Sequence, residues 1–181
     1  EDDERALAFA ARHADLVDAS FVRDADDVRA LYARLAALGA DRLGVVLKIE
    51  TSGAFACLPA IILAALERAP VGVMIARGDL AIESGYQRLA ELQEEMLWLC
   101  EAAHVPVIWA TQVLDQLART GRPSRAEVTD AAMAVRAECV MLNKGPYVAE
   151  AVAALDDILR RMEQHQYKKR SLYRRLHLAL P

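Results

Sequence analysis

The chain of 181 residues has no apolar run long enough to cross a membrane. Its longest runs, such as residues 58–66, fall well short of the roughly 20 residues that a membrane helix needs. A secretory signal and a transit peptide are also missing, so we expect a cytoplasmic protein without a membrane partner. No linker or low-complexity tract divides the chain, which predicts one domain. The missing initiator methionine suggests a fragment or a processed product.

An excess of basic residues is absent as well. The net charge of −4 and the isoelectric point of about 5.6 give no reason to propose a nucleic-acid partner. Cysteine is scarce, and Cys57, Cys100 and Cys139 are widely spaced in apolar surroundings. We interpret them as reduced core residues rather than disulfide partners or metal ligands. Hydrophobic residues make up 55% of the chain, which indicates a globular protein and not a disordered one.

Short apolar runs alternate with segments that have helical periodicity. The expected strands are residues 16–22, 43–49, 71–75, 105–109 and 139–142. A first helix is expected to end at residue 13. Six further helices are expected over residues 24–39, 53–66, 84–103, 113–118, 124–137 and 147–162. Strands that alternate with helices predict an α/β fold with a parallel sheet and helical crossovers.

The central stretch of the chain is VGVMIARGDLAIE, residues 71–83. Its unbroken apolar run is typical of a strand buried on both faces. Gly78 permits close approach of the backbone to a ligand, and Asp79 follows the strand end. Ligands bind at that end of parallel strands in barrel folds. The alternative is a plain turn with solvated charges.

Charged residues also lie at the end of the preceding strand. Lys48 and Glu50 are two residues apart in a strand, so their side chains share one face. Glu50 and Asp79 end neighbouring strands, and no histidine or cysteine accompanies them. Such oxygen ligands suit Mg²⁺ or Mn²⁺. Lys48 would then hold a phosphoryl oxygen or a developing enolate. The alternative is a structural ion pair between Lys48 and Glu50.

Two further groups belong to the same predicted rim. The backbone N–H groups of Arg77, Gly78 and Asp79 precede a helix and suit a small carboxylate. Thr111 ends the next strand and offers a hydroxyl, although it could instead cap a helix. Four successive strand ends with complementary groups favour a functional site.

Several segments together resemble consecutive motifs of the pyruvate kinase family. They are residues 19–23 (ASFVR), 45–50 (VVLKIE), 74–83 (MIARGDLAIE), 106–114 (PVIWATQVL), 122–135 (RPSRAEVTDAAMAV) and 139–142 (CVML). The family has a (β/α)8 barrel, so the resemblance implies a partial TIM barrel, strands four to eight. It implies a barrel segment over residues 1–162 and a basic C-terminal helix or tail over residues 163–181.

The resemblance also implies roles for individual residues. Lys48 would assist phosphoryl transfer, and Glu50 and Asp79 would hold the divalent metal. The backbone of residues Ala76, Arg77, Gly78 and Asp79 would cradle the pyruvate carboxylate. Thr111 would serve protonation of the enolate, and Ser20 would be a weaker match at the phosphate end.

The implied reaction converts phosphoenolpyruvate and ADP to pyruvate and ATP. Nothing in the chain matches the family's first three strands, which bear its nucleotide and K⁺ residues, or its lid domain. Ala81 and the segment Asn143-Lys144-Gly145-Pro146 also depart from the family pattern. We therefore expect this chain alone to be inactive or nearly so, with K⁺ relevant only to an intact parent protein.

Two other functions remain open from the sequence. One is a Mg²⁺-dependent aldolase, lyase or oxaloacetate decarboxylase that works on a pyruvate enolate without ADP. The other is a non-catalytic oligomerising or ligand-sensing domain. Five strands cannot close an eight-stranded barrel, so we also expect self-association or an upstream segment. The basic segment from residue 164 to 181 predicts an amphipathic helix docked on the barrel or a second subunit, with membrane or nucleic-acid binding as alternatives.

Overall fold

The computed structural model describes residues 2–68 and 70–166, and it divides into two compact units, Glu1–Val107 and Ile108–Pro181. The first unit contains α1 (Asp2–His13), β1 (Leu16–Ala19), α2 (Ala25–Ala37), β2 (Gly44–Ile49), α3 (Ser52–Ala56), α4 (Leu58–Ala65), β3 (Val71–Ala76), α5 (Arg77–Ser84) and α6 (Tyr86–Ala102). Strand β4 (Val107–Val113) starts at the boundary. The second unit continues with α7 (Asp115–Thr120), α8 (Arg125–Met133), the 3₁₀ turn η1 (Ala134–Arg136), β5 (Cys139–Leu142) and α9 (Val148–Gln166).

The strands pair in parallel within each unit. In the first unit β1 pairs with β2, and β2 pairs with β3, with Ala19 opposite Leu47 and Ile49 opposite Ile75. In the second unit β5 pairs with β4. The predicted α/β class, with parallel strands alternating with helices, is therefore confirmed over the described part of the chain.

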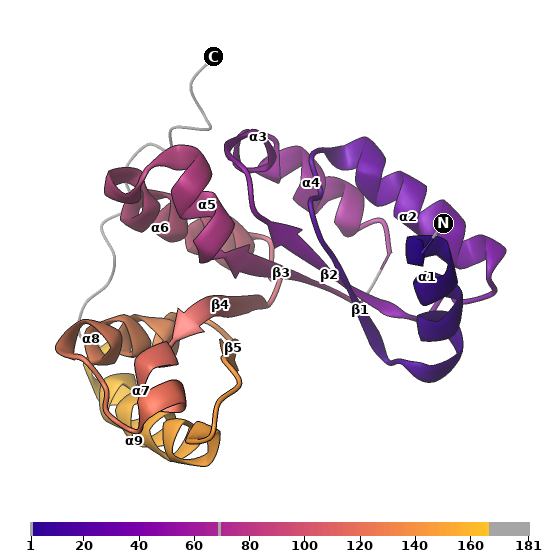
Figure 1. Cartoon of the computed structure of the whole chain (residues 1–181). Coiled ribbons are helices and arrows are strands. Elements are labelled where there is room, and N and C mark those ends of the chain that lie inside the picture. The colour runs from indigo at the N-terminus through magenta and orange to yellow at the C-terminus, as the bar shows by residue number, and fades with distance from the viewer. Residues whose placement is uncertain (1, 69, 167–181) are drawn as a thin grey trace. The chain divides into compact units, whose positions relative to one another are not determined.

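The core of the first unit lies around β2 and β3. Val45, Leu47, Ile49, Val73 and Ile75 are almost completely buried. Helices α2 and α4 lie side by side along these strands (Figure 1). Because the strands are covered on both faces, each presents a continuous apolar run, as the sequence predicted.

Two helix starts follow local capping rules. Asp24 caps α2, because its side chain accepts hydrogen bonds from the N–H groups of Asp26 and Asp27 at 2.9 and 3.0 Å. Ser124 and Glu127 form a capping box at the start of α8. In each case a side-chain oxygen satisfies a backbone donor that the helix leaves unpaired.

Replacing Asp24 with alanine should lower the free energy of unfolding by about 1 kcal/mol, because the first turn of α2 loses its acceptor. Asp26→Ala is the matched control. The Asp26 side chain is 91% exposed and pairs with Arg29 on the surface, so its loss should change stability by less than about 0.5 kcal/mol. Urea unfolding followed by circular dichroism measures both. Equal losses in the two variants would contradict the capping role.

Several predicted boundaries were wrong. β1 ends at Ala19 and not at residue 22. The predicted helix over residues 53–66 is two helices, with Pro59 in the first turn of α4. The predicted helix over residues 84–103 begins only at Tyr86, because Gly85 has a φ of 84° and separates α5 from α6. β4 starts later than predicted and continues through Thr111 to Val113.

Some apolar residues of the helices are exposed. Leu38 is 43% exposed because α2 ends before it. On α9 the buried residues are Ala151 and Leu155, whereas Val148 and Val152 lie on the neighbouring stripe and are 39% and 55% exposed. Cysteine burial also differs from the prediction: all three thiols are free, but only Cys100 is buried, Cys57 is half-buried and Cys139 is exposed.

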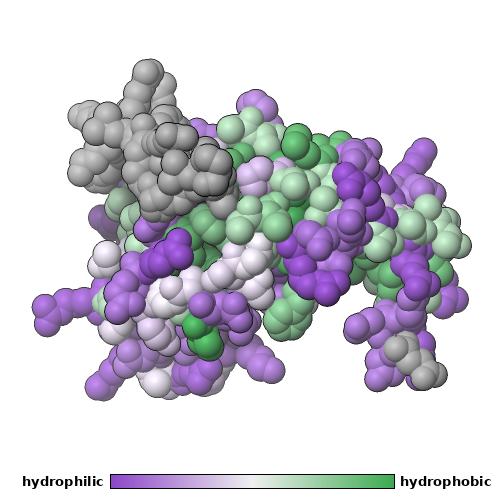
Figure 2. Space-filling model, turned by 90° about the horizontal axis from the view of Figure 1, so that it is seen from above, coloured by the Kyte–Doolittle hydropathy of each residue, from purple (hydrophilic) through white to green (hydrophobic). Residues whose placement is uncertain are grey.

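Apolar side chains reach the surface at several places (Figure 2). In the first unit the most exposed are Tyr86, Ile82, Leu63, Phe21 and Phe9. No helix of the described residues combines the length and the apolar character that a bilayer span requires. Most of the predicted basic tail, from residue 167 onward, lies outside the described residues.

Candidate functional site

The carboxyl end of β2 carries an ion pair between Lys48 and Glu50. Lys48 Nζ lies 2.9 Å from Glu50 Oε1, and the Glu50 side chain is only 2% exposed. The Lys48 side chain is 24% exposed, so its ammonium is accessible from solvent while it pairs with a buried carboxylate. A buried carboxylate requires such partners, because desolvation disfavours its charge.

The end of β1 supplies two more contacts to this pair. Lys48 Nζ donates a hydrogen bond to Ser20 Oγ at 2.9 Å. The backbone N–H of Phe21 donates to Glu50 Oε2 at 2.6 Å. Both oxygens of Glu50 are thus engaged, one by an ammonium and one by an amide. The structure therefore brings Ser20, Lys48 and Glu50 together.

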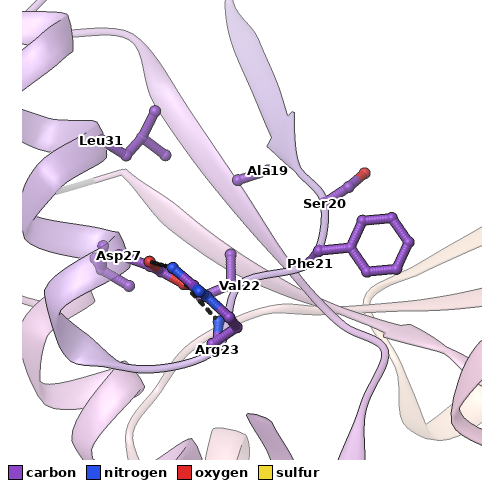
Figure 3. A pocket seen from close by; sticks show the side chains of 8 residues that line it. Ala19, Ser20, Phe21, Val22, Arg23, Asp27 and Leu31 are labelled. Carbon is purple, nitrogen blue, oxygen red and sulfur yellow. Dashed lines mark hydrogen bonds and ion pairs between the residues drawn. The ribbon is translucent and has the colours of Figure 1, made fainter. Parts of the chain in front are cut away.

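The chain that follows Phe21 is held by a second ion pair (Figure 3). Arg23 donates from Nε and Nη2 to the two oxygens of Asp27 at 2.9 and 2.7 Å, and its backbone N–H donates at 2.9 Å. These side-chain hydrogen bonds hold the pKa of Asp27 below its usual value of 3.8. A cavity of about 500 Å³ lies here, lined by residues 19–23 and by Asp27, Val28 and Leu31.

The start of α5 lies at the same edge as Glu50. Ile49 is opposite Ile75, so Glu50 is level with Ala76, and Asp79 follows in the first turn of α5. Asp79 is exposed, and no side chain caps the helix. The backbone of residues Ala76, Arg77, Gly78 and Asp79 therefore forms the helix N-terminus predicted as a carboxylate cradle, and its role as a cradle stays a prediction.

Thr111 belongs to the second unit, within β4. It is half-buried and has a φ of 63°, and the adjacent Gln112 has a φ of 57°. A left-handed backbone is unusual for a β-branched residue, and such residues are frequent at functional sites. Thr111 is not the N-cap of α7, because that position is Leu114. Its predicted catalytic role stays a prediction.

The donor set near Glu50 fits a hard divalent cation. Within residues 2–68 and 70–166, no three His, Cys, Asp or Glu side chains gather into a metal site. Mg²⁺ typically takes only one or two carboxylates and completes its shell with water and substrate oxygens. Each carboxylate oxygen has two acceptor positions, so Glu50 keeps capacity beyond the contacts from Lys48 and Phe21.

A model of the family "Pyruvate kinase, barrel domain" matches residues 1–152. This match covers most of the chain. The chain belongs to the pyruvate kinase family. Human "Pyruvate kinase PKLR" is 37% identical over 188 aligned residues, covering 100% of this chain and 32% of the human protein. "Pyruvate kinase" of Clostridium acetobutylicum is 35% identical over 170 residues, 90% of this chain and 35% of that protein.

The chain spans about a third of the length of these curated relatives. "Pyruvate kinase 1" of Trypanosoma brucei brucei gives the same picture, with 38% identity over 84% of this chain and 31% of its own length. The resemblance to the pyruvate kinase family that the sequence motifs indicated is thereby confirmed.

The segment that departs from the family pattern, residues 143–146, is tied into the second unit. Asn143 Nδ2 donates to Asp115 Oδ1, which also accepts from Arg119 Nε at 3.0 Å. Gly145 packs against the backbone of Ala118, and Tyr147 N–H donates to Ala118 O at 3.0 Å. This member of the pyruvate kinase family therefore has a close-packed turn after β5.

One group at the site was missed by the sequence reasoning: the backbone N–H of Phe21. A backbone donor leaves no trace in residue type. The only signal was position, because Phe21 directly follows Ser20, which the family motif had already placed at the site.

Proposed function

We propose that the chain carries the metal- and pyruvate-binding part of a pyruvate kinase-type phosphotransferase. The reaction would transfer phosphate from phosphoenolpyruvate to ADP. The observation that carries the proposal is the Lys48–Glu50 pair: a buried carboxylate beside a solvent-accessible ammonium, at a strand end of a chain from this family.

Each residue then has a defined task. Lys48 would offset the negative charge of the transferring phosphoryl group, which is the main requirement of this chemistry. Glu50 and Asp79 would hold Mg²⁺ or Mn²⁺, which when bound neutralises charge on substrate oxygens. The N-terminus of α5 would orient the substrate carboxylate, because its N–H groups and dipole favour an anion. Thr111 would support the proton step at the enolate carbon, and Ser20 would keep Lys48 in place.

Binding of Mn²⁺ together with oxalate, a planar analogue of the pyruvate enolate, tests the proposal. We expect calorimetry to show oxalate binding only when Mn²⁺ is present. Asp79→Asn should weaken it by at least about 100-fold, because a metal ligand is lost. Glu83→Gln, an exposed acidic residue on the same helix, is the matched control and should bind like the parent chain. No binding by the parent chain would contradict the proposal.

A kinase assay on the 181-residue chain separates this part of the site from the whole reaction. We expect no steady-state formation of ATP from phosphoenolpyruvate and ADP, because the family's nucleotide-binding residues have no match in this sequence. Robust turnover would show that the chain supplies a complete site. Metal-dependent decarboxylation of oxaloacetate without ADP would instead favour lyase chemistry on the same residues.

A further inference from the structure

Phe21 has an unusual backbone for an aromatic residue. Its φ of 54° lies in the left-handed region, which is unfavourable for a residue with a bulky side chain. Its ring is 63% exposed, so burial of the ring does not compensate for this conformation. Something other than packing of the side chain must therefore favour the left-handed turn.

The contact that the turn makes is with Glu50. The pairing of β1 with β2 ends where Ala19 is opposite Leu47, and the chain then leaves the sheet. In the left-handed conformation the Phe21 N–H reaches Glu50 Oε2 at 2.6 Å, which is short and typical of a charge-assisted hydrogen bond. Because the acceptor is a buried carboxylate paired with the Lys48 ammonium, this hydrogen bond is stronger than one between neutral groups.

The turn is fixed on both sides of Phe21. On one side Ser20 accepts from Lys48, the ion-pair partner of Glu50. On the other side Val22 is 6% exposed, and Arg23 is tied to Asp27 through its backbone and its side chain. The turn therefore cannot rotate freely to relieve the strain at Phe21 (Figure 3).

We propose that Phe21 is a positioning residue, whose left-handed backbone holds its N–H on Glu50 and fixes the orientation of that carboxylate. Lys48 holds one oxygen of Glu50 and Phe21 holds the other, so the remaining acceptor positions face a defined direction. This inference rests on the proposed function only where it concerns the cation. The positioning of Glu50 depends on the backbone conformation of Phe21 and not on its aromatic ring.

That distinction gives opposite expectations for two substitutions. Phe21→Gly removes the ring but adopts the left-handed conformation without strain, so Mn²⁺ affinity should stay within about threefold of the parent. Phe21→Val keeps an apolar side chain, but a β-branched residue resists that conformation. We expect Mn²⁺ binding about 10- to 100-fold weaker, the usual effect of losing a partner of a metal ligand. A role for the ring in binding a ligand predicts the reverse order.

A second measurement tests the contact without any metal. In a ¹H–¹⁵N correlation spectrum the Phe21 amide proton should lie far downfield, because its hydrogen bond to a carboxylate is short. Glu50→Gln should move it upfield, since the acceptor loses its charge. The Glu127 amide, which donates to Ser124 Oγ at 3.2 Å in the second unit, is the internal reference and should not move.

The outcomes separate the two proposals. If the parent binds Mn²⁺ and Phe21→Val binds it equally well, Phe21 has no positioning role, although the metal site stands. If the parent binds no Mn²⁺, the proposed function fails, and the Phe21 amide alone decides the inference. An amide proton that Glu50→Gln leaves unmoved overturns it. If circular dichroism shows that Phe21→Val does not fold, the ¹H–¹⁵N spectrum of the parent chain and of Glu50→Gln decides whether Phe21 has the positioning role.

Discussion

Replacing Glu50 with glutamine is expected to weaken Mn²⁺ binding by at least about 100-fold, because the cation loses a charged ligand. The substitution is nearly isosteric, and the amide oxygen can still accept the hydrogen bond from Phe21 N–H. The loss should therefore reflect charge and not a cavity. Calorimetric titration of the 181-residue chain with MnCl₂ measures it.

The same substitution should lower the free energy of unfolding by about 1–2 kcal/mol. The hydrogen bond from Phe21 N–H becomes one to a neutral amide oxygen, and the new amide nitrogen offers the Lys48 ammonium no acceptor. Lys48 is 24% exposed, however, and can turn toward water. Because Lys48 can be solvated, the loss of unfolding free energy should stay below the roughly 3–5 kcal/mol that follows when a fully buried ion pair loses one partner. Urea unfolding followed by circular dichroism measures the change.

Glu83→Gln provides the control for both measurements, since it makes the same chemical change on the exposed face of α5. It should leave the Mn²⁺ affinity unaltered and the stability within about 0.5 kcal/mol. If Glu50→Gln binds Mn²⁺ as well as Glu83→Gln does, then Glu50 has only a structural role. That result would favour the structural ion pair, an interpretation that the Lys-x-Glu pattern also allows.

Gly145→Ala should be among the most destabilising single methyl additions in the chain. A Cβ at this position would overlap Ala118 O and the Ala118 carbonyl carbon, and it would lie 3.1 Å from Arg119 N. These are backbone atoms of α7, so no change of rotamer relieves the overlap. We expect a loss of about 3 kcal/mol, the upper end of the usual range for overpacking.

Gly44→Ala is the matched comparison. A Cβ at residue 44 would also overlap a neighbouring atom, but that atom is the end of the Leu16 side chain, which is 56% exposed. The next atom, Pro70 Cγ, would lie 3.1 Å away. Leu16 can rotate into solvent, so the loss should stay below about 1 kcal/mol. Thermal unfolding of the two variants compares them. Similar losses would mean that the turn after β5 yields more easily than its contacts with α7 suggest.

Local sequence patterns predicted much of the fold. Asp24 and Ser124 can be identified as helix caps from the sequence, because a side-chain oxygen beside a helix start has one obvious donor to satisfy. The apolar runs that became β2 and β3 were recognised because strands covered on both faces need no polar alternation. These features depend on residues that are close in sequence, so a short segment of the sequence is sufficient to predict them.

Features that depend on distant residues or on backbone conformation were missed. β1 stops after Ala19 because Phe21 turns toward Glu50, which is 29 residues away in sequence. Periodicity alone favours Val152 as a core residue, whereas α9 packs through the adjacent stripe that contains Ala151. β4 continues past its predicted end through the left-handed residues Thr111 and Gln112, where its register with β5 shifts. No propensity scale anticipates such residues.

The candidate site was predicted in part. The spacing of Lys48 and Glu50 was sufficient to place both on one face, and their ion pair agrees with it. The convergence of Asp79 and Thr111 on that pair was predicted from their positions at successive strand ends, and it stays a prediction.

The turn after β1 also imposes a constraint on chain length. Two successive residues, Ser20 and Phe21, engage the ammonium of Lys48 and the carboxylate of Glu50 respectively. Replacing the exposed ring does not change the length of the turn. A one-residue insertion or deletion between Ala19 and Phe21 would displace the Ser20 hydroxyl from Lys48 and the Phe21 N–H from Glu50. We therefore expect indels in this turn to disrupt both contacts.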